Sequence, residues 1–297
     1  MIRRLQTAKE DVMSGRSVRR VFVFALVFGC LGLMSATPAE AQREFEPLFD
    51  KFNFQLEGSW VGLKTEIRLD SEVLGRGTKL SFEDDLDLDS LKTIPTLSFE
   101  WQIARKHKLA LRWQDISRDS SAQALTEIQW GDENIPIDAD ITLGFDIEQW
   151  FLDYAYYPWV KENWAAGFGI GVRTMDIQAT LAWREDTIDE EGSSDVKGTA
   201  PLPYLYFEYR RLFSDNWRFV TGLGWLYVKI DDIEGGQWIG RVGIEYLAGR
   251  RWSFGAAVNV AQATVEWTAI AIEEGDLLSA DIDLDINDFS VFVRVRF

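Results

Sequence analysis

The sequence is poor in three kinds of residue on which many activities depend. Its 297 residues include one cysteine, Cys30, and one histidine, His107. Cys30 lies in a segment that we expect to be removed, so the mature chain would have no thiol chemistry, disulfide or cysteine metal site. Basic residues are also few, with 31 Lys and Arg against 48 Asp and Glu and a net charge of -17. Because phosphate binding depends on clustered Lys and Arg, no nucleic-acid partner is expected.

Long apolar runs are missing as well. The run Val21 to Met34 has about 14 residues, whereas a membrane-crossing helix needs about 20. Arg16, Arg19 and Arg20 directly precede it, and the small-x-small triplet Ala39-Glu40-Ala41 follows it. This order predicts a signal peptide over residues 1–41, cleaved after Ala41 and exported by general secretion.

Two alternatives concern this first segment. Met13 could be the true start, and Gly29-Cys30 suggests a lipoprotein signal. Lipidation is disfavoured because Phe28 is bulky where a small residue is wanted. We expect residues 42–51 to form a short periplasmic segment before the main domain.

What the sequence does have is alternating apolar and polar residues. No run of 12 apolar residues follows residue 41, so a membrane-spanning mature chain must cross as strands. Near the C-terminus, Phe289, Val291, Val293, Val295 and Phe297 alternate with Asp288, Ser290, Phe292, Arg294 and Arg296. The same period of two recurs over Trp238–Tyr246 and Leu97–Ile103. It is typical of a β-strand with one apolar face.

The connections between these runs alternate between short and long. The four short turns are Arg105–Lys108, Lys161–Asn163, Ser214–Asn216 and Gly249–Arg251. The five longer, polar connections are Asp70–Leu91, Gly131–Ile137, Asp186–Ala200, Asp231–Gly236 and Glu273–Asp283. Nine connections predict about ten strands with both ends periplasmic, and eight or twelve strands are the alternatives.

Aromatic residues gather near both kinds of connection, as in the two interfacial girdles of membrane barrels. The expected periplasmic girdle contains Tyr156, Tyr157, Trp159, Trp164, Phe213, Trp217, Tyr246 and Trp252. The expected external girdle contains Trp130, Trp183, Trp225, Trp238 and Trp267. The apolar parity switches near Trp60 and near Glu148–Trp150, which suggests bulges or strands that project beyond the membrane.

Residues 52–297 therefore resemble outer-membrane β-barrel proteins, and in architecture they are similar to the small OmpA-like and OmpW-like class without matching one member. The predicted fold is all-β: a single antiparallel, up-and-down transmembrane barrel. The terminal residues Val293, Val295 and Phe297 match the family's C-terminal signal for assembly. The resemblance implies a bacterial outer-membrane location, with membrane lipid, lipopolysaccharide, periplasmic chaperones and the barrel assembly machinery as partners.

Strand parity predicts a charged barrel interior. The candidate lumen charges are Glu100, Arg112, Asp146, Glu148, Arg173, Glu208, Arg210, Arg241, Glu245, Arg294 and Arg296. They could line a narrow solute path or form a paired network that plugs the barrel. The plug is favoured, because a barrel of about ten strands is little wider than the eight-stranded kind that side chains fill. Inward glycines, namely Gly167, Gly169, Gly171, Gly222, Gly224 and Gly243, could open the lumen or leave room for long side chains.

Acidic tracts suggest a second kind of site. Asp281, Asp283 and Asp285 alternate along one strand face, and two further acidic tracts, Glu83–Asp89 and Asp189–Glu191, lie in predicted loops. We interpret them as solvated charge, with weak divalent-cation binding as a hypothesis, because no EF-hand glycine is present. His107 lies in a predicted periplasmic turn, and no motif for a cofactor appears. We therefore expect no enzymatic activity and no cofactor.

The expected function is that of a narrow passive pore for ions or small solutes, or of a closed structural protein of the cell envelope. The alternative is a surface interaction protein that acts through acidic external loops.

Overall fold

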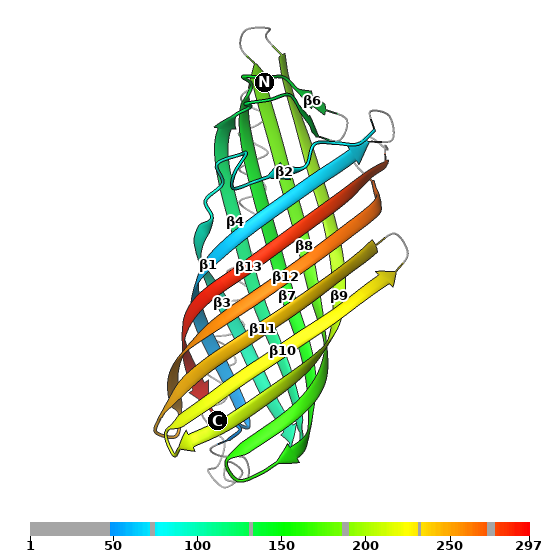
Figure 1. The fold of residues 1–297 in the computed structure, drawn as a ribbon. Coiled ribbons are helices and arrows are strands. Elements are labelled where there is room, and N and C mark those ends of the chain that lie inside the picture. The colour runs from blue at the N-terminus through cyan, green and yellow to red at the C-terminus, as the bar shows by residue number, and fades with distance from the viewer. Residues whose placement is uncertain (1–47, 72–74, 131–132, 186–189, 231–232, 272–276) are drawn as a thin grey trace. The chain divides into compact units, whose positions relative to one another are not determined.

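The computed structural model describes residues 48–297 except 72–74, 131–132, 186–189, 231–232 and 272–276. The described chain forms a barrel of ten long strands (Figure 1). They are β1 (Phe52–Ser71), β3 (Leu91–Ala104), β4 (His107–Gln123), β7 (Asp140–Val160), β8 (Trp164–Glu185), β9 (Glu190–Ser214), β10 (Trp217–Ile230), β11 (Ile233–Ala248), β12 (Trp252–Ala271) and β13 (Leu277–Arg296). Three short strands, β2 (Leu80–Ser81), β5 (Ile128–Trp130) and β6 (Glu133–Ile135), lie in connections.

Every long strand pairs antiparallel with its neighbours along the chain, and β13 pairs with β1 to close the sheet. The closing seam runs from Asn53↔Arg296 to Ser71↔Leu278. The prediction of a ten-stranded, up-and-down barrel is confirmed. In the part of the wall next to the two chain ends, every strand has a partner on both sides. The backbone N–H and C=O groups there can therefore hydrogen-bond within the sheet. Within the described residues, no helix has the length and apolarity needed to span a membrane.

The two ends of the barrel differ. At the end that we call the turn end, four connections of two or three residues join β3–β4, β7–β8, β9–β10 and β11–β12, as predicted. At the other end, the loop end, the predicted connections were too long. β9 begins at Glu190, β11 at Ile233 and β13 at Leu277, so much of three expected loops is strand. Polar residues misled the prediction because these strand ends face water.

The inner and outer faces exchange character at one height along the barrel. On β7, Phe145 and Ile147 point inward and are fully buried, whereas Leu152 and Tyr154 point outward and are exposed. The pairing of β7 with β4 and β8 runs through this segment without a register shift. The parity switch at Glu148–Trp150 is therefore a change of surroundings on a continuous strand. The prediction of a bulge is wrong there, and projection beyond the membrane stays a prediction.

Trp60 and Val61 show the same exchange on β1. Trp60 is half exposed, and Val61 begins an inward apolar series toward the loop end. The register with β13 is again continuous. We call the part between this level and the turns the turn half, and the remainder the loop half.

Two sites of lost strand pairing shape the loop half. The β3–β4 ladder ends at Thr96↔Gln114, next to Pro95, and the β9–β10 ladder ends at Leu205↔Trp225, two residues from Pro203. Proline has no N–H to donate to a ladder, so it belongs where pairing stops. Beyond these points the wall divides into one group of strands from β4 to β9 and another from β10 through β13 to β1 and β3.

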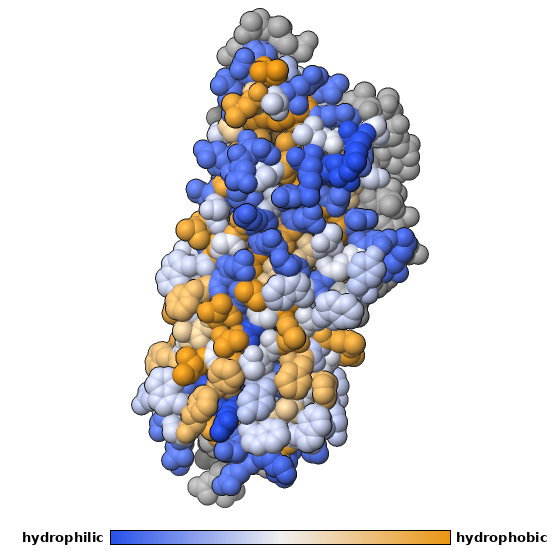
Figure 2. Space-filling view, viewed as in Figure 1, coloured by the Kyte–Doolittle hydropathy of each residue, from blue (hydrophilic) through white to orange (hydrophobic). Residues whose placement is uncertain are grey.

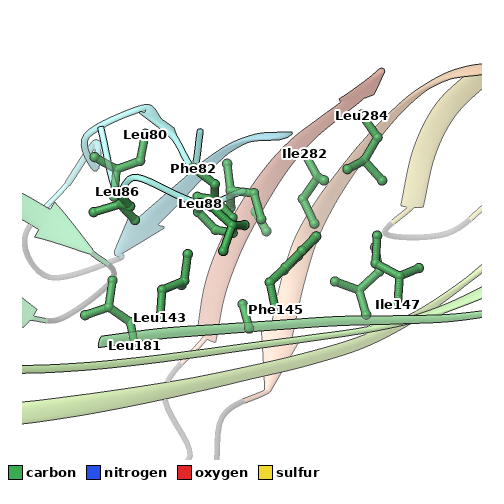
Figure 3. Close-up of a cluster of buried hydrophobic side chains, with 14 of the residues drawn as sticks. Leu80, Phe82, Leu86, Leu88, Leu143, Phe145, Ile147, Leu181, Ile282 and Leu284 are labelled. Carbon is green, nitrogen blue, oxygen red and sulfur yellow. The ribbon is translucent and has the colours of Figure 1, made fainter. Parts of the chain in front are cut away.

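An apolar core fills the space between these two groups (Figure 3). Ile147 and Leu143 approach from β7, and Ile282 and Leu284 from β13. Phe82, from the connection between β1 and β3, lies over the core and packs edge-on against Phe145, with ring centroids 5.2 Å apart. The loop half thus has the interior of a water-soluble domain.

The outer surface shows the reverse pattern. The turn half carries exposed apolar and aromatic side chains, and on the face shown in Figure 2 the loop half is mostly hydrophilic. The exposed belt includes Leu152, Phe168, Ile170, Leu205, Leu223, Val242, Ile244, Val258, Phe289 and Val291. Such a band is the surface expected against hydrocarbon.

Candidate functional site

The turn half encloses most of the predicted interior charges. Glu100, Arg112, Arg173, Glu208, Arg210, Arg241, Glu245, Arg294 and Arg296 all point inward and line its interior or pair there. Asp146 and Glu148 do not. They alternate with the buried Phe145 and Ile147 and so lie on the outer face, where the Glu148 carboxylate accepts hydrogen bonds from the Trp113 and Trp150 indoles. The parity rule assigned them inward because it assumed a polar interior at every level.

The first charge cluster closes the turn end, and it includes a residue from outside the strands. Asp50 precedes β1, is buried, and binds Arg296 at 2.6 Å and Arg218 at 2.9 Å. Arg218 also binds Glu245 at 2.9 Å, and Arg294 binds Glu245 at 3.2 Å. Burial alone would raise the pKa of the Asp50 carboxyl, but Arg218 and Arg296 outweigh burial and hold that pKa below its usual range.

The neighbours of Asp50 complete this closure. Leu48 and Phe49 are buried, and the Leu48 carbonyl accepts a hydrogen bond from Arg218 at 3.2 Å. The Phe49 ring packs edge-on against Tyr157 at 4.9 Å, and the Arg210 guanidinium lies over it at 5.5 Å. Three residues of the expected periplasmic segment therefore lie inside the barrel mouth and fill it.

A second charge cluster lies deeper. The Glu208 carboxylate binds Lys108 and Arg210, each at 2.5 Å, and accepts a hydrogen bond from the Tyr157 hydroxyl. Arg210 also binds Glu100 at 3.1 Å, 110 positions away in the chain. Each charge has an opposite partner, which is the condition under which buried charges are tolerated.

Sequence reasoning missed several members of these clusters. Lys108, Arg218 and Glu57 share the inward parity of strands that were recognised, so extending the alternation to the strand ends would have found them. Asp50 had no such signal, because it lies before the first strand. Tyr157 was predicted in the periplasmic girdle, but its side chain is fully buried inside the barrel.

Inward glycines on β8 make room for tyrosine rings rather than for a channel. A Cβ on Gly169 would lie 2.3 Å from the Tyr206 ring, and one on Gly171 would lie 2.5 Å from the Tyr204 ring. A Cβ on Gly167 would meet Tyr157 at 2.7 Å. The tyrosine rings occupy the space that a larger side chain would need at these three positions, so the glycines allow the interior to be filled.

Among the described residues, two small cavities lie in the interior, one next to the apolar core and one among the charge clusters. The larger, of about 140 Å³, is lined by Arg112, Phe151 and Arg173 among others, and the smaller is about 90 Å³. Between the larger cavity and the loop end lies the apolar core, into which Arg118 alone of the buried arginines projects, bound to Glu83 and to the Thr65 hydroxyl at 2.5 Å. Along the described chain, side chains thus close the interior toward both ends.

The aromatic girdles are partly as predicted. Tyr156, Trp159, Phe213, Trp217, Tyr246 and Trp252 are exposed near the turns, and Trp225 and Trp238 are exposed near the upper edge of the apolar belt. Trp130 and Trp183 were predicted in the external girdle but belong to the apolar core. Their environment is the protein interior because the wall continues beyond the belt. The side chain of Trp267 lies outside the described residues.

His107 lies at the start of β4, on the outer side of the turn end. Its Nδ1 is 2.7 Å from the Tyr154 hydroxyl, and its ring packs against Tyr156 at 5.2 Å. Two acids of β13 are paired on the outer face, Asp281 with Arg68 and Asp283 with Lys79, each at 2.9 Å. The predicted signal peptide, and its cleavage site after Ala41, lie outside the described residues.

The C-terminal residues close the barrel. Val295 pairs with Phe54 of β1, and Val293 with Leu56. The Phe297 backbone exchanges two hydrogen bonds with Phe52, at 2.8 and 3.1 Å. The three residues of the predicted assembly signal are thus the end of the closing strand.

Comparison with known proteins defines the fold. The outer membrane protease OmpT of Escherichia coli superposes with a TM-score of 0.55 at 10% identity, over 86% of this chain and 98% of that one. The toluene transporter TodX of Pseudomonas putida gives 0.33 at 8% identity over 88% and 94%, and the outer membrane protein OprG of Pseudomonas aeruginosa gives 0.31 at 13% over 84% and 97%.

No family model and no curated protein matches the sequence. The likeness to OmpT therefore shows the fold alone, a closed antiparallel barrel of the kind found in that outer-membrane protein. A shared fold does not decide the activity.

Proposed function

We propose that this protein is a closed barrel of the bacterial outer membrane that holds a folded, apolar-cored body outside the bilayer, and that it does not conduct ions. The observation that carries the proposal is the filled interior. Asp50 and its arginines close one end, and the core around Phe145 fills the other. These contacts favour a paired charge network that plugs the barrel over one that lines a narrow solute path.

Planar-bilayer recording tests this function. The purified mature protein should insert and produce no discrete conductance steps. Insertion is verified separately by its resistance to added protease, so that silence reflects a closed barrel. Steps whose ion preference changes in Glu208→Gln would support the pore instead, because Glu208 would then face the permeating ions.

A second candidate, surface recognition through acidic residues, has less support. Asp281 and Asp283 lie on the outer face of the loop half but are paired with Arg68 and Lys79. Paired acids have less charge to offer a partner. Salt-dependent binding of a cationic peptide by the reconstituted protein would favour this candidate.

We further infer export by the signal peptide over residues 1–41 and assembly through Val293, Val295 and Phe297. Phe297→Ala tests the second inference, because it removes the ring but keeps both backbone hydrogen bonds to Phe52. Expression in a bacterial host should yield less assembled protein in the outer-membrane fraction. Phe297→Tyr, which keeps an aromatic ring, should give the wild-type amount of assembled protein. An unchanged amount of assembled protein for F297A would contradict the inference.

A further inference from the structure

The 140 Å³ cavity lies where the charged interior meets the apolar core. One row of side chains across three strands forms part of its wall: Arg112 on β4, Phe151 on β7 and Arg173 on β8 are direct cross-strand neighbours. Both guanidinium groups lie beside the same ring, at 5.1 and 5.2 Å from its centroid. Two positive charges thus flank one aromatic side chain at the end of the polar interior.

These cations lack the partners that the other interior charges have. Within the described chain, Arg112 lines both cavities and makes no hydrogen bond or ion pair, and the carboxylates of Asp153, Glu57 and Glu100 attract it only at longer range. Arg173 is 1% exposed and binds only the side-chain oxygens of Gln149, at 2.6 and 2.9 Å, and of Gln237, at 3.4 Å. A buried guanidinium without a carboxylate partner is costly.

A third donor points to the same cavity. Gln149 is fully buried, its oxygen is occupied by Arg173, and its Nε2 has no partner among the described residues. The acceptors that line the cavity are by contrast occupied. Glu57 binds Arg241 at 2.9 Å, Asp288 accepts a hydrogen bond from Asn259 at 2.6 Å, and Asp153 accepts one from the Tyr204 hydroxyl. The unused hydrogen-bonding capacity is mostly that of donors.

We propose that this cavity binds a small carboxylate, held by the Arg112 guanidinium and the Gln149 side-chain amide beside Arg173. A planar carboxylate matches the two-pronged donor of arginine and supplies the acceptors that are missing. A single negative charge fits better than a phosphate dianion, because Glu57, Asp153 and Asp288 lie in the same wall. The site is independent of whether the barrel conducts.

Refolding the full mature chain from urea into detergent micelles tests the proposal, because a ligand present during folding need not cross the closed interior. Radiolabelled acetate is the probe, and equilibrium dialysis counts the bound anion. We expect saturable binding of one acetate per barrel and a rise in Tm with acetate concentration that chloride or phosphate at equal ionic strength does not produce.

Arg112→Gln should weaken acetate binding roughly tenfold or more, the effect of losing a hydrogen-bonded charge. The matched control is Arg211→Gln, because Arg211 also stacks on an aromatic ring, Phe213 at 5.5 Å, but is exposed on the outside. If R112Q does not assemble, Arg112→Lys is the second variant, because it keeps the charge and loses the two-pronged donor. R112K should also bind acetate more weakly than the wild type does.

Three results would overturn the proposal. The first is no bound acetate after refolding, which leaves water as the occupant. The second is an equal gain in Tm from chloride. The third is acetate affinity that is unchanged in R112Q, or in R112K where only that variant folds.

Discussion

The two halves of this barrel place their apolar side chains on opposite faces of the same strands. In the turn half, the outer face is apolar and the interior holds Asp50, Glu208 and their arginines. In the loop half, the outer face is hydrophilic and the interior holds Phe145, Ile147 and other apolar side chains. The medium on each side of a sheet therefore decides which residues face inward. The alternation alone does not decide it.

The largest effect should come from imposing the chemistry of one half on the other. Ile147→Asp places a carboxylate in the apolar core without a partner, which should cost on the order of 5 kcal/mol or more and block assembly. Asp140→Asn, an exposed acid on the outer face of the same strand, should behave like the wild type. Urea unfolding in micelles measures both, and a stable I147D barrel would mean that water reaches this core.

Breaking the charge network of the turn half should have the next largest effect. Arg218→Ala leaves Asp50 and Glu245 without a shared cation, and removing one partner of a buried ion pair costs about 3–5 kcal/mol. Arg211→Ala removes an exposed arginine and serves as the control. Unfolding free energies that are the same for the two variants would show that the turn-end cluster contributes little to stability.

A smaller effect is expected from filling the space beside the tyrosine rings. Gly171→Ala directs a methyl group into the Tyr204 ring, and overpacking of this kind costs about 1–3 kcal/mol. Gly58→Ala is the matched control, because a Cβ there meets nothing within 4 Å. Equal Tm values for the two variants would contradict the close packing on β8.

The smallest effect should be a gradual one with pH. The folded pKa of Asp50 is lowered, so its contribution to stability is complete above the usual value of 3.8 and is lost as pH falls through the folded pKa. The difference in unfolding free energy between wild type and Asp50→Asn should therefore be constant near neutrality and shrink below about pH 4. A difference independent of pH would mean that the Asp50 carboxyl is not held ionised by its arginines.

Much of the turn half could be predicted from the sequence, because its strands obey one rule. Apolar side chains that alternate with charged ones, between short turns, placed Glu208 and Arg241 inside correctly. The rule failed where the strands leave the belt. Period two shows that two faces differ, but it does not show which face is inside, and so Trp130, Trp183, Asp146 and Glu148 were misplaced.

The candidate site was predicted in its members and not in its arrangement. Arg112 and Arg173 were recognised as inward, but their position beside one ring depends on the register of three strands. Register is set by turn geometry and packing over the whole sheet, and the alternation of a single strand contains little of it. The loops that cover the core, around Phe82, gave no periodic signal at all.

The seam between β1 and β13 has a consequence for the order in which the molecule is made. Asp50 meets Arg296 across 246 positions, and Gln55 meets Arg294 across 239. Contacts at such separation form slowly and cannot exist before the last strand has left the ribosome. Until then Asp50 and Gln55 lack these arginines and the first strand is paired on one side only, so the final residues of the chain determine when the polypeptide becomes a barrel.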